Sequence, residues 1–141
     1  MPVKVFIALC LMFVILSPAL SWAEDESGEE VEDTGSSYVK IDPAFVTNYG
    51  GTNRLRYVKV DVTLKVANGP GQAQVAHHLP VIKDSLLMLL SQQGNDTIDT
   101  VEGKEALRSE SLAKIAELLA KEDGESHVQE VLFTSFVAHT L

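Results

Sequence analysis

Cysteine is almost absent from this chain of 141 residues, and the single one is Cys10. It lies inside an apolar N-terminal segment, so no disulfide can form within the rest of the chain. A domain without disulfides depends on a packed core, or on partners, for its stability. The same absence disfavours a structural zinc site, because such sites usually use cysteine thiolates as ligands.

Basic residues are also few: eleven Lys and Arg stand against twenty Asp and Glu, a formal net charge of −9. Seven of the acids lie in residues 24–37, "EDESGEEVEDTGSS", which contain no base. A stretch this polar cannot bury enough surface to offset its ordering entropy, so we expect an acidic disordered linker. Because the remainder has no basic patch, nucleic-acid binding is not expected.

Long apolar runs are missing except at the N-terminus. Residues 5–16 are apolar, follow a basic start and lead into "SPALSWA". The small residues Ser21 and Ala23, two apart, are typical of a secretory cleavage site. Alternatively, residues 5–23 are retained as an anchor, since nineteen uncharged residues in a helix span roughly 28 Å, barely a bilayer core. Residues 1–23 are therefore a signal peptide or a membrane anchor, and either one directs export.

The clearest β-strand pattern covers residues 55–66, "LRYVKVDVTLKV", where apolar and polar residues alternate. Its apolar face consists of Val58, Val60, Val62, Leu64 and Val66. This alternation predicts a sheet with one packed and one solvated face. Residues 38–41 and 44–49 also have an extended pattern, and Gly50 and Gly51 supply turn chemistry after them. We therefore predict an antiparallel hairpin with the long strand.

Two amphipathic helices are predicted after the hairpin. The first has apolar residues at helical spacing over residues 75–90, and either kinks at Pro80 or has its main part begin there. The second runs from about residue 100 to 121, and Gly124 is well placed as its C-terminal cap. The final strand, residues 128–138, has apolar residues on both faces, which predicts a strand between two others.

The predicted order is β-β-α-α-β over residues 38–141. Two helices between neighbouring strands can both pack on the one apolar face that the long strand provides. The sequence thus predicts a small α+β domain, with an antiparallel sheet and two helices packed on one face, after the N-terminal hydrophobic segment and the acidic linker.

The stretch "TVEGKEALRSESL" places a Gly-Lys pair at the start of the second helix, as phosphate-binding loops do. A Walker loop needs a glycine five residues before Gly103 and a hydroxyl two residues after it. The nearest upstream glycine is Gly94, and Glu105 takes the hydroxyl position, where it would repel a phosphate. We predict no nucleotide site, and interpret the stretch as a helix start capped by Asp99 or Thr100.

The histidines do not indicate a metal-binding or catalytic site either. His77 and His78 are adjacent, and on a helix they point about 100° apart, so they rarely bind one metal ion together. Ser109 and Ser111 have no nearby base that would activate a nucleophile. We therefore predict no catalytic, cofactor-binding or metal-binding residues, no cofactor, and no enzymatic activity.

Five short motifs occur in order between residues 38 and 139: "PAFVTN", "RYVKV", "PVIKD", "TVEGK" and "FTSFVAH". In order and spacing they resemble the flagellar basal body-associated FliL family. The typical marks of that family are Pro-Phe-x-x-Asn, Arg-Tyr-x-x-Val, Pro-x-Ile-Arg/Lys-Asp, Thr-x-Glu-Gly-Lys and Phe-Thr-x-Phe-Val-x-Gln. This sequence departs from them at an inserted Ala44, at Lys83 where arginine is frequent, and at His139 where glutamine is frequent. Family members also typically begin with a cytoplasmic tail and a longer uncleaved helix.

The resemblance implies a stomatin-like (SPFH-like) periplasmic domain near the flagellar motor, attached to the inner membrane as a single-pass protein. It implies a homo-oligomeric ring that supports the stator units, and hence swimming and swarming, with flagellar stator and basal body proteins as partners. The alternative is a soluble periplasmic binding or chaperone-like module with the same fold, which predicts cleavage after Ala23. The departures from the family marks also leave open that this chain is a divergent paralogue of the main motor protein.

Partner contacts are expected on charged helix faces, because the apolar faces are already assigned to the core. The best sequence-level candidates are Lys83 and Asp84 on the first helix and Lys104 and Arg108 on the second. The alternative is ordinary solvated charge, paired along the helix surface at a spacing of four residues.

Overall fold

The computed structural model describes residues 35–51 and 55–141. The chain divides into two units, Met1–Glu32 and Asp33–Leu141, and the described residues all belong to the second. The predicted signal peptide or anchor, and most of the predicted linker, therefore lie outside the described residues. The last two residues of that predicted linker, Ser36 and Ser37, already belong to the first strand.

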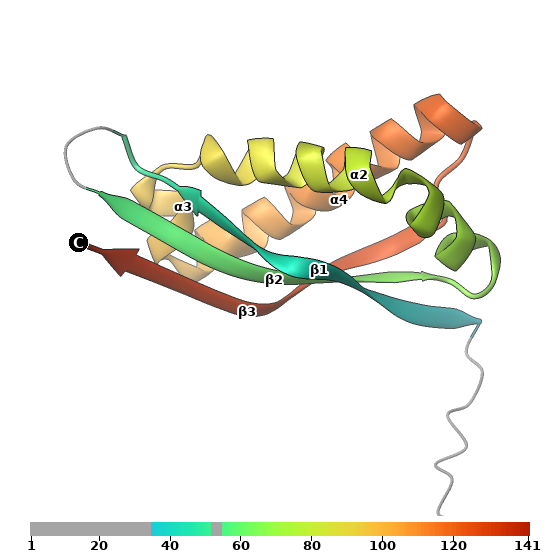
Figure 1. Ribbon diagram of the computed structural model, residues 1–141, viewed down its shortest axis with the longest axis horizontal. Coiled ribbons are helices and arrows are strands. Elements are labelled where there is room, and N and C mark those ends of the chain that lie inside the picture. The colour runs from blue at the N-terminus through green and yellow to red at the C-terminus, as the bar shows by residue number, and fades with distance from the viewer. Residues whose placement is uncertain (1–34, 52–54) are drawn as a thin grey trace, which may run out of the picture. The chain divides into compact units, whose positions relative to one another are not determined.

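The domain is α+β, as predicted, with a three-stranded antiparallel sheet and helices (Figure 1). The strands are β1 (Ser36–Asn48), β2 (Arg56–Ala67) and β3 (Val128–Thr140), in the spatial order β1-β2-β3. The helices are α2 (Pro70–Ser91), α3 (Asn95–Asp99) and α4 (Val101–Asp123), all between β2 and β3 in the chain. None of the described helices is long and apolar enough to cross a membrane.

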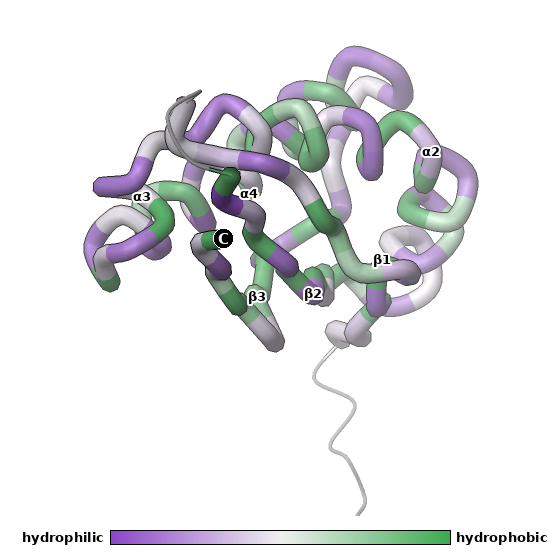
Figure 2. Tube along the Cα trace, turned by 60° about the vertical axis from the view of Figure 1, so that its left-hand side comes forward, coloured by the Kyte–Doolittle hydropathy of each residue, from purple (hydrophilic) through white to green (hydrophobic). Residues whose placement is uncertain are grey.

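The alternating strand at residues 56–67 is confirmed, and it is the centre of the sheet. Its apolar residues Val58, Val60, Val62, Leu64 and Val66 are all fully buried. Hydrophobic and hydrophilic positions alternate along the strands in Figure 2. The predicted hairpin is also confirmed, because β1 pairs antiparallel with β2 along most of its length.

The prediction that the last strand lies between two others was wrong. Within the described residues β3 pairs only with β2 and forms an edge of the sheet. The apolar residues on both faces of β3 therefore do not reflect a position between two strands. Val131 and Phe133 face the core opposite Leu64 and Val62, while Leu132 and Val137 lie on the other face.

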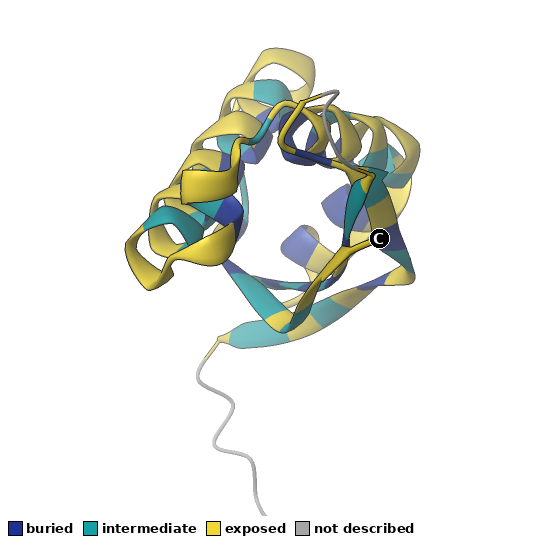
Figure 3. Cartoon of the chain, turned by 90° about the vertical axis from the view of Figure 1, so that its left-hand side faces the viewer, coloured by how far each residue is buried: buried dark blue, intermediate teal, exposed yellow. Residues whose placement is uncertain are grey.

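Helices α2 and α4 cover the inner face of the sheet, α2 over β1 and β2 and α4 over β3. Buried residues line the space between the helix layer and the sheet, and exposed residues lie outside it (Figure 3). The core joins the apolar face of β2 to buried residues of both long helices, among them Ile82, Leu86, Ile115 and Leu119. Each edge strand therefore has a helix of its own beside it.

Helix α2 continues through Pro80 rather than starting there, and it begins with Pro70 in its first turn. A proline within a helix removes one backbone hydrogen bond and bends the helix. In Figure 1 the first turns of α2, drawn in green, run in a different direction from the yellow-green remainder.

The short helix α3 was not expected, because five residues are too few to show helical periodicity. Its Ile98 is fully buried and joins the core. Helix α4 is capped by Thr100, whose Oγ1 accepts from the backbone N–H of Gly103 at 3.0 Å. A Cβ atom at Gly103 would lie 2.5 Å from the backbone of Asp96 and Thr97, so glycine lets α3 and α4 approach closely. At the other end Gly124, with φ of 88°, is the predicted cap.

Candidate functional site

The four predicted contact residues lie in two separate places. Lys83 and Asp84 are on α2 and border a hollow beside β1, whereas Lys104 and Arg108 are on α4 and border a hollow beside β3. Because β1 and β3 are the two edges of the sheet, the candidates do not form one patch. We call the two places the β1-edge hollow and the β3-edge hollow.

The β1-edge hollow forms where β1 is irregular. The pairing of β1 with β2 shifts between Ile41 and Phe45, and the Asp42–Pro43 peptide bond in this bulge is cis. A proline cannot donate to a neighbouring strand, so it is tolerated here because β1 is at the edge. The bulge frees the carbonyl of Asp42, which accepts a hydrogen bond from Lys83 Nζ at 2.7 Å.

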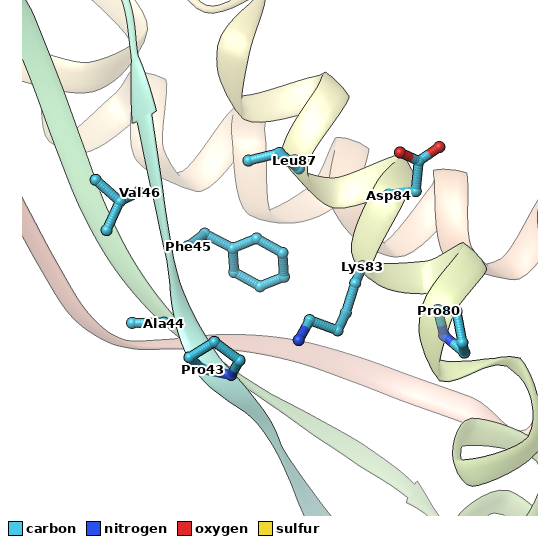
Figure 4. Close-up of a pocket in the computed structure, with 8 residues that line it drawn as sticks. All are labelled: Pro43, Ala44, Phe45, Val46, Pro80, Lys83, Asp84 and Leu87. Carbon is cyan, nitrogen blue, oxygen red and sulfur yellow. The ribbon is translucent and has the colours of Figure 1, made fainter.

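Eight residues of β1 and α2 line this hollow of about 490 Å³ (Figure 4): Pro43, Ala44, Phe45, Val46, Pro80, Lys83, Asp84 and Leu87. The ring of Phe45 is almost fully buried, while Val46 and Leu87 are exposed at the rim. In Figure 4 the carboxylate of Asp84 points away from the strand, whereas the side chain of Lys83 reaches toward it. The hollow is therefore apolar at its base, with one uncommitted carboxylate at its rim.

A charge pair lies on β1 itself, next to the bulge. Lys40 Nζ is 3.0 Å from Asp42 Oδ1, and both side chains are largely exposed. The hydrogen bond to Asp42 and the charge of this carboxylate raise the pKa of Lys40 above its ordinary value. The β1 edge thus carries a proline, a bulge and a fixed pair of opposite charges.

The β3-edge hollow, of about 440 Å³, lies between α4 and β3. It is lined by Val101, Lys104, Glu105, Arg108, Leu132, Phe133 and Phe136. Lys104 Nζ lies 5.0 Å from the centroid of the Phe136 ring, a cation–π distance. The rings of Phe133 and Phe136 are 5.6 Å apart and are only partly buried, so the hollow exposes aromatic surface.

Arg108 connects α4 to the start of β3. Its Nε donates to Glu105 Oε2 at 2.9 Å, and its Nη1 lies 3.4 Å from both Glu130 Oε1 and the carbonyl oxygen of Val131. The hydrogen bond from Arg108 holds the pKa of Glu105 below its ordinary value. The pair Glu105–Arg108 has i,i+3 spacing, rather than the expected spacing of four residues.

Lys104 and Arg108 do not project into solvent, although a surface position was expected for them. Both are partly buried and reach β3, Lys104 over an aromatic ring and Arg108 onto a strand carbonyl. Their α4 positions are four residues apart, so they share one helix face, and this face turns toward the strand rather than away from it. The aromatic residues Phe133 and Phe136 belong to the same site and were not predicted as site residues.

A polar cluster outside both hollows joins α2 to the end of α4. Gln74 Nε2 donates to Asp123 Oδ2 and to the carbonyl of Glu125, both at 2.9 Å, and His78 Nε2 lies 2.9 Å from Asp123 Oδ2. These bonds, first from Gln74 and then from His78, lower the pKa of Asp123. Within residues 35–51 and 55–141, no group of three or more His, Cys, Asp or Glu side chains is arranged to hold a metal ion.

The two hollows contain most of the sequence marks that suggested a family. The motifs "PAFVTN" and "PVIKD" supply seven of the eight residues that line the β1-edge hollow. The motifs "TVEGK" and "FTSFVAH" supply Val101, Lys104, Phe133 and Phe136 of the β3-edge hollow. Only "RYVKV", which opens the central strand, lies in neither.

A comparison of the whole chain with family models decides the assignment. Residues 38–138 match the family described as "Flagellar basal body-associated protein FliL". The chain belongs to the FliL family. The resemblance read from the five motifs is therefore confirmed, and with it the association of the family with the flagellum and motility.

Two curated FliL proteins show how far the similarity extends. The chain is 35% identical to the flagellar protein FliL of Aquifex aeolicus strain VF5 over 98 residues, which are 70% of this chain and 58% of that protein. It is 27% identical to the flagellar protein FliL of Escherichia coli strain K12 over 115 residues, 82% of this chain and 72% of that one. The match thus spans little more than half the length of the Aquifex FliL.

Proposed function

We propose that this protein is a non-enzymatic scaffold of the flagellar basal body, located in the periplasm, that supports the stator units of the motor. The observation that carries this proposal is the position of the family marks. Four of the five line two hollows at opposite edges of the sheet, so the residues typical of FliL proteins provide surface rather than a catalytic centre.

The residues that line the hollows have the composition typical of protein–protein contact surfaces. Each combines an apolar base with a few charged groups, and recognition surfaces commonly have such an apolar centre with a polar rim. We propose that Lys83 and Asp84 contribute to one partner contact and that Lys104 and Arg108 contribute to another. A molecule with contacts at both edges can join a homo-oligomeric ring of stomatin-like domains while it also touches stator or basal body proteins.

We propose that residues 5–23 stay in the inner membrane as a single anchor, and that residues 24–34 link this anchor to the domain. The alternative, cleavage after Ala23, would give a soluble periplasmic protein of the binding or chaperone type. Mass spectrometry of the mature N-terminus separates the two: we expect an intact N-terminal segment in the membrane fraction. A mature chain that begins at Glu24 in the soluble fraction would exclude the anchored form.

The function is tested in motile cells that lack the gene. We expect reduced swimming and swarming and lower motor torque under load, with recovery when the full chain is restored. Unchanged swimming, swarming and torque would overturn the proposal. A tagged copy should localise to the flagellar base only when stator proteins are present. The tag needs a linker, because the backbone N–H of Leu141 donates to Leu55 next to the last paired residues.

A matched pair of substitutions on α4 tests the contact residues. Lys104→Glu reverses a charge inside the β3-edge hollow, whereas Lys121→Glu reverses the charge of a residue that borders a different hollow, between α2 and α4. We expect restored motility with Lys121→Glu and reduced motility with Lys104→Glu, at equal protein levels. Equal motility of the two variants would remove Lys104 from the contact.

A further inference from the structure

The β3 strand has an edge that is open over its second half. In a strand, successive backbone N–H groups point alternately to the two sides. The N–H of Leu141 points toward β2, since it donates to the carbonyl of Leu55 at 2.9 Å. The N–H groups of Phe136, Ala138 and Thr140 therefore point away from β2, and β3 is the last strand on that side of the described sheet.

The first part of the same edge is closed by a side chain. Arg108 Nη1 lies 3.4 Å from the carbonyl oxygen of Val131, and Thr134 interrupts the pairing register, with its Oγ1 donating to the carbonyl of Asp61 at 3.3 Å. The open stretch is therefore residues 135–140. An unpaired strand edge is a template for another strand, and proteins usually protect it with proline, charge or a bulge.

None of these protections is present in the open stretch. Residues 131–141, "VLFTSFVAHTL", contain no Asp, Glu, Lys, Arg, Pro or Gly. Val137 is exposed on the outer face, and Leu132 and Phe136 are only partly buried. The β3-edge hollow adjoins this strand on the inner face and leaves aromatic surface uncovered there. Pairing with another strand would satisfy the open backbone N–H groups and would cover the exposed apolar side chains.

We propose that the occupant of this edge is β3 of a second copy of the chain, paired antiparallel about a two-fold axis. Two features point to a second copy. The stretch is uncharged, so two identical strands can lie side by side with no like charges opposed. The other edge of the sheet is interrupted, because β1 carries Pro43, the bulge and the bond from Lys83 to the Asp42 carbonyl. This interruption separates residues 36–41, which include the charged Lys40, from the short stretch 45–48, so each copy offers one uncharged edge stretch of six residues, 135–140.

A two-fold contact uses the same stretch of both copies, so it gives a closed pair rather than a fibre. The two sheets join into one of six strands, and the inward side chains of each added strand cover the partner's β3-edge hollow. This contact rests on the proposed function in one respect: the contact and the scaffold role both require that copies of the chain bind each other. A ring would then be assembled from such pairs through other surfaces, including the β1-edge hollow.

Site-directed cross-linking in the full chain tests the pairing, with Cys10→Ser as background so that each variant has one thiol. Single cysteines are placed on the outer face of β3, at Ser135 and Val137, and on the outer face of β1, at Val46. Val46 is 59% exposed and Val137 is 41% exposed, so exposure alone would favour the β1 cysteine. Copper phenanthroline serves as the oxidant, and the product is read on a non-reducing gel.

We expect a disulfide-linked dimer from the β3 cysteines, strongest at the position nearest the two-fold axis, and about tenfold less from Val46→Cys. Equal cross-linking at both edges, or none at β3, would overturn the proposal. Cross-linking is then repeated with Ala138→Pro, which removes an outward N–H but no bond to β2. We expect loss of the dimer with little change in thermal unfolding.

A second variant covers the case in which Ala138→Pro unfolds. Val137→Glu, combined with Ser135→Cys, places a carboxylate from each copy within the paired stretch, where the two repel, whereas within the chain Val137 is the register partner of Lys59. We expect a folded monomer, and a cross-linked dimer that persists with Val137→Glu would overturn the proposal. Motility assays decide the scaffold function, so the contact and the function can fail separately.

Discussion

The two edges of the sheet are built alike and protected differently. β1 and β3 each have 13 residues, each has a long helix beside it, and in each a basic side chain from that helix bonds a strand carbonyl. Both strands contain a register irregularity, but β1 additionally has a proline and a Lys–Asp pair, whereas β3 contains no proline and is uncharged after Glu130. A helix beside a strand does not by itself close the edge of that strand, and the uncharged β3 edge is the side that we propose for pairing.

The largest expected difference between the two sides concerns their aromatic residues. Phe45 of β1 is 5% exposed within the core, whereas Phe136 of β3 is only partly buried beside its hollow. We expect Phe45→Ala to lower the free energy of unfolding by about 3 kcal/mol or more, and Phe136→Ala by about half as much. Urea unfolding of both variants measures this. Equal losses would mean that the β3 side is packed as tightly as the β1 side.

A smaller difference is expected for the two basic side chains that bond the edges. Arg108 contacts two acids and the Val131 carbonyl, whereas Lys83 makes one hydrogen bond to the Asp42 carbonyl. We expect Arg108→Met to lower the free energy of unfolding by about 1 kcal/mol and Lys83→Met by about 0.5 kcal/mol.

The control for this pair is Lys121→Met, at the end of α4, which should leave unfolding unchanged. A larger loss from Lys83→Met than from Arg108→Met would reverse the comparison and would indicate that the β1 bulge depends on its lysine. Repeating the measurement in high salt should shrink the Arg108 effect more, because exposed ion pairs are screened.

The smallest expected effect is on the pH dependence of stability, and it has opposite signs at the two edges. The pKa of Glu105 lies below its ordinary value because of Arg108, so its pairing stabilises the fold above that ordinary value and is lost as pH falls through the folded pKa. The pKa of Lys40 is raised by Asp42, so its pairing stabilises at neutral pH and is lost as pH rises through the raised pKa.

Glu105→Gln should therefore flatten the acid side of the stability profile, and Lys40→Met the alkaline side. Thermal unfolding followed from pH 3 to 6 and from pH 9 to 12 gives both slopes, with each variant serving as the control for the other. If both variants changed the same side of the profile, the assignment of one pH-sensitive ion pair to each edge would be contradicted.

Much of the fold was predictable from local patterns. The alternation in residues 55–66 predicted a half-buried strand, and Gly50 and Gly51 predicted its hairpin with β1. The edge position of β3 was not predicted, because apolar residues on both faces of a strand are compatible with a central strand or with an open apolar edge. The proline in β1 was a usable signal, since a central strand rarely tolerates one.

The candidate site was predictable in part. The charged residues Lys83, Asp84, Lys104 and Arg108 do border hollows, and their role in partner contact stays a prediction. The aromatic half of the β3-edge hollow was assigned to the core instead. A periodic pattern shows which side of a helix or strand is apolar, but it does not show how completely a neighbour covers it.

The residues alone were enough to predict the three strands, the two long helices and the family, though not the short helix α3. Strand period, helix caps and the five motifs are local features, and local features follow from residues near one another in the chain. The folded domain was needed to show that β3 is an edge, that Lys104 and Arg108 turn toward it, and that the motifs meet in two separate hollows. Those facts depend on which strands pair and which helix covers which strand, and such contacts between distant residues are set by packing of the whole domain.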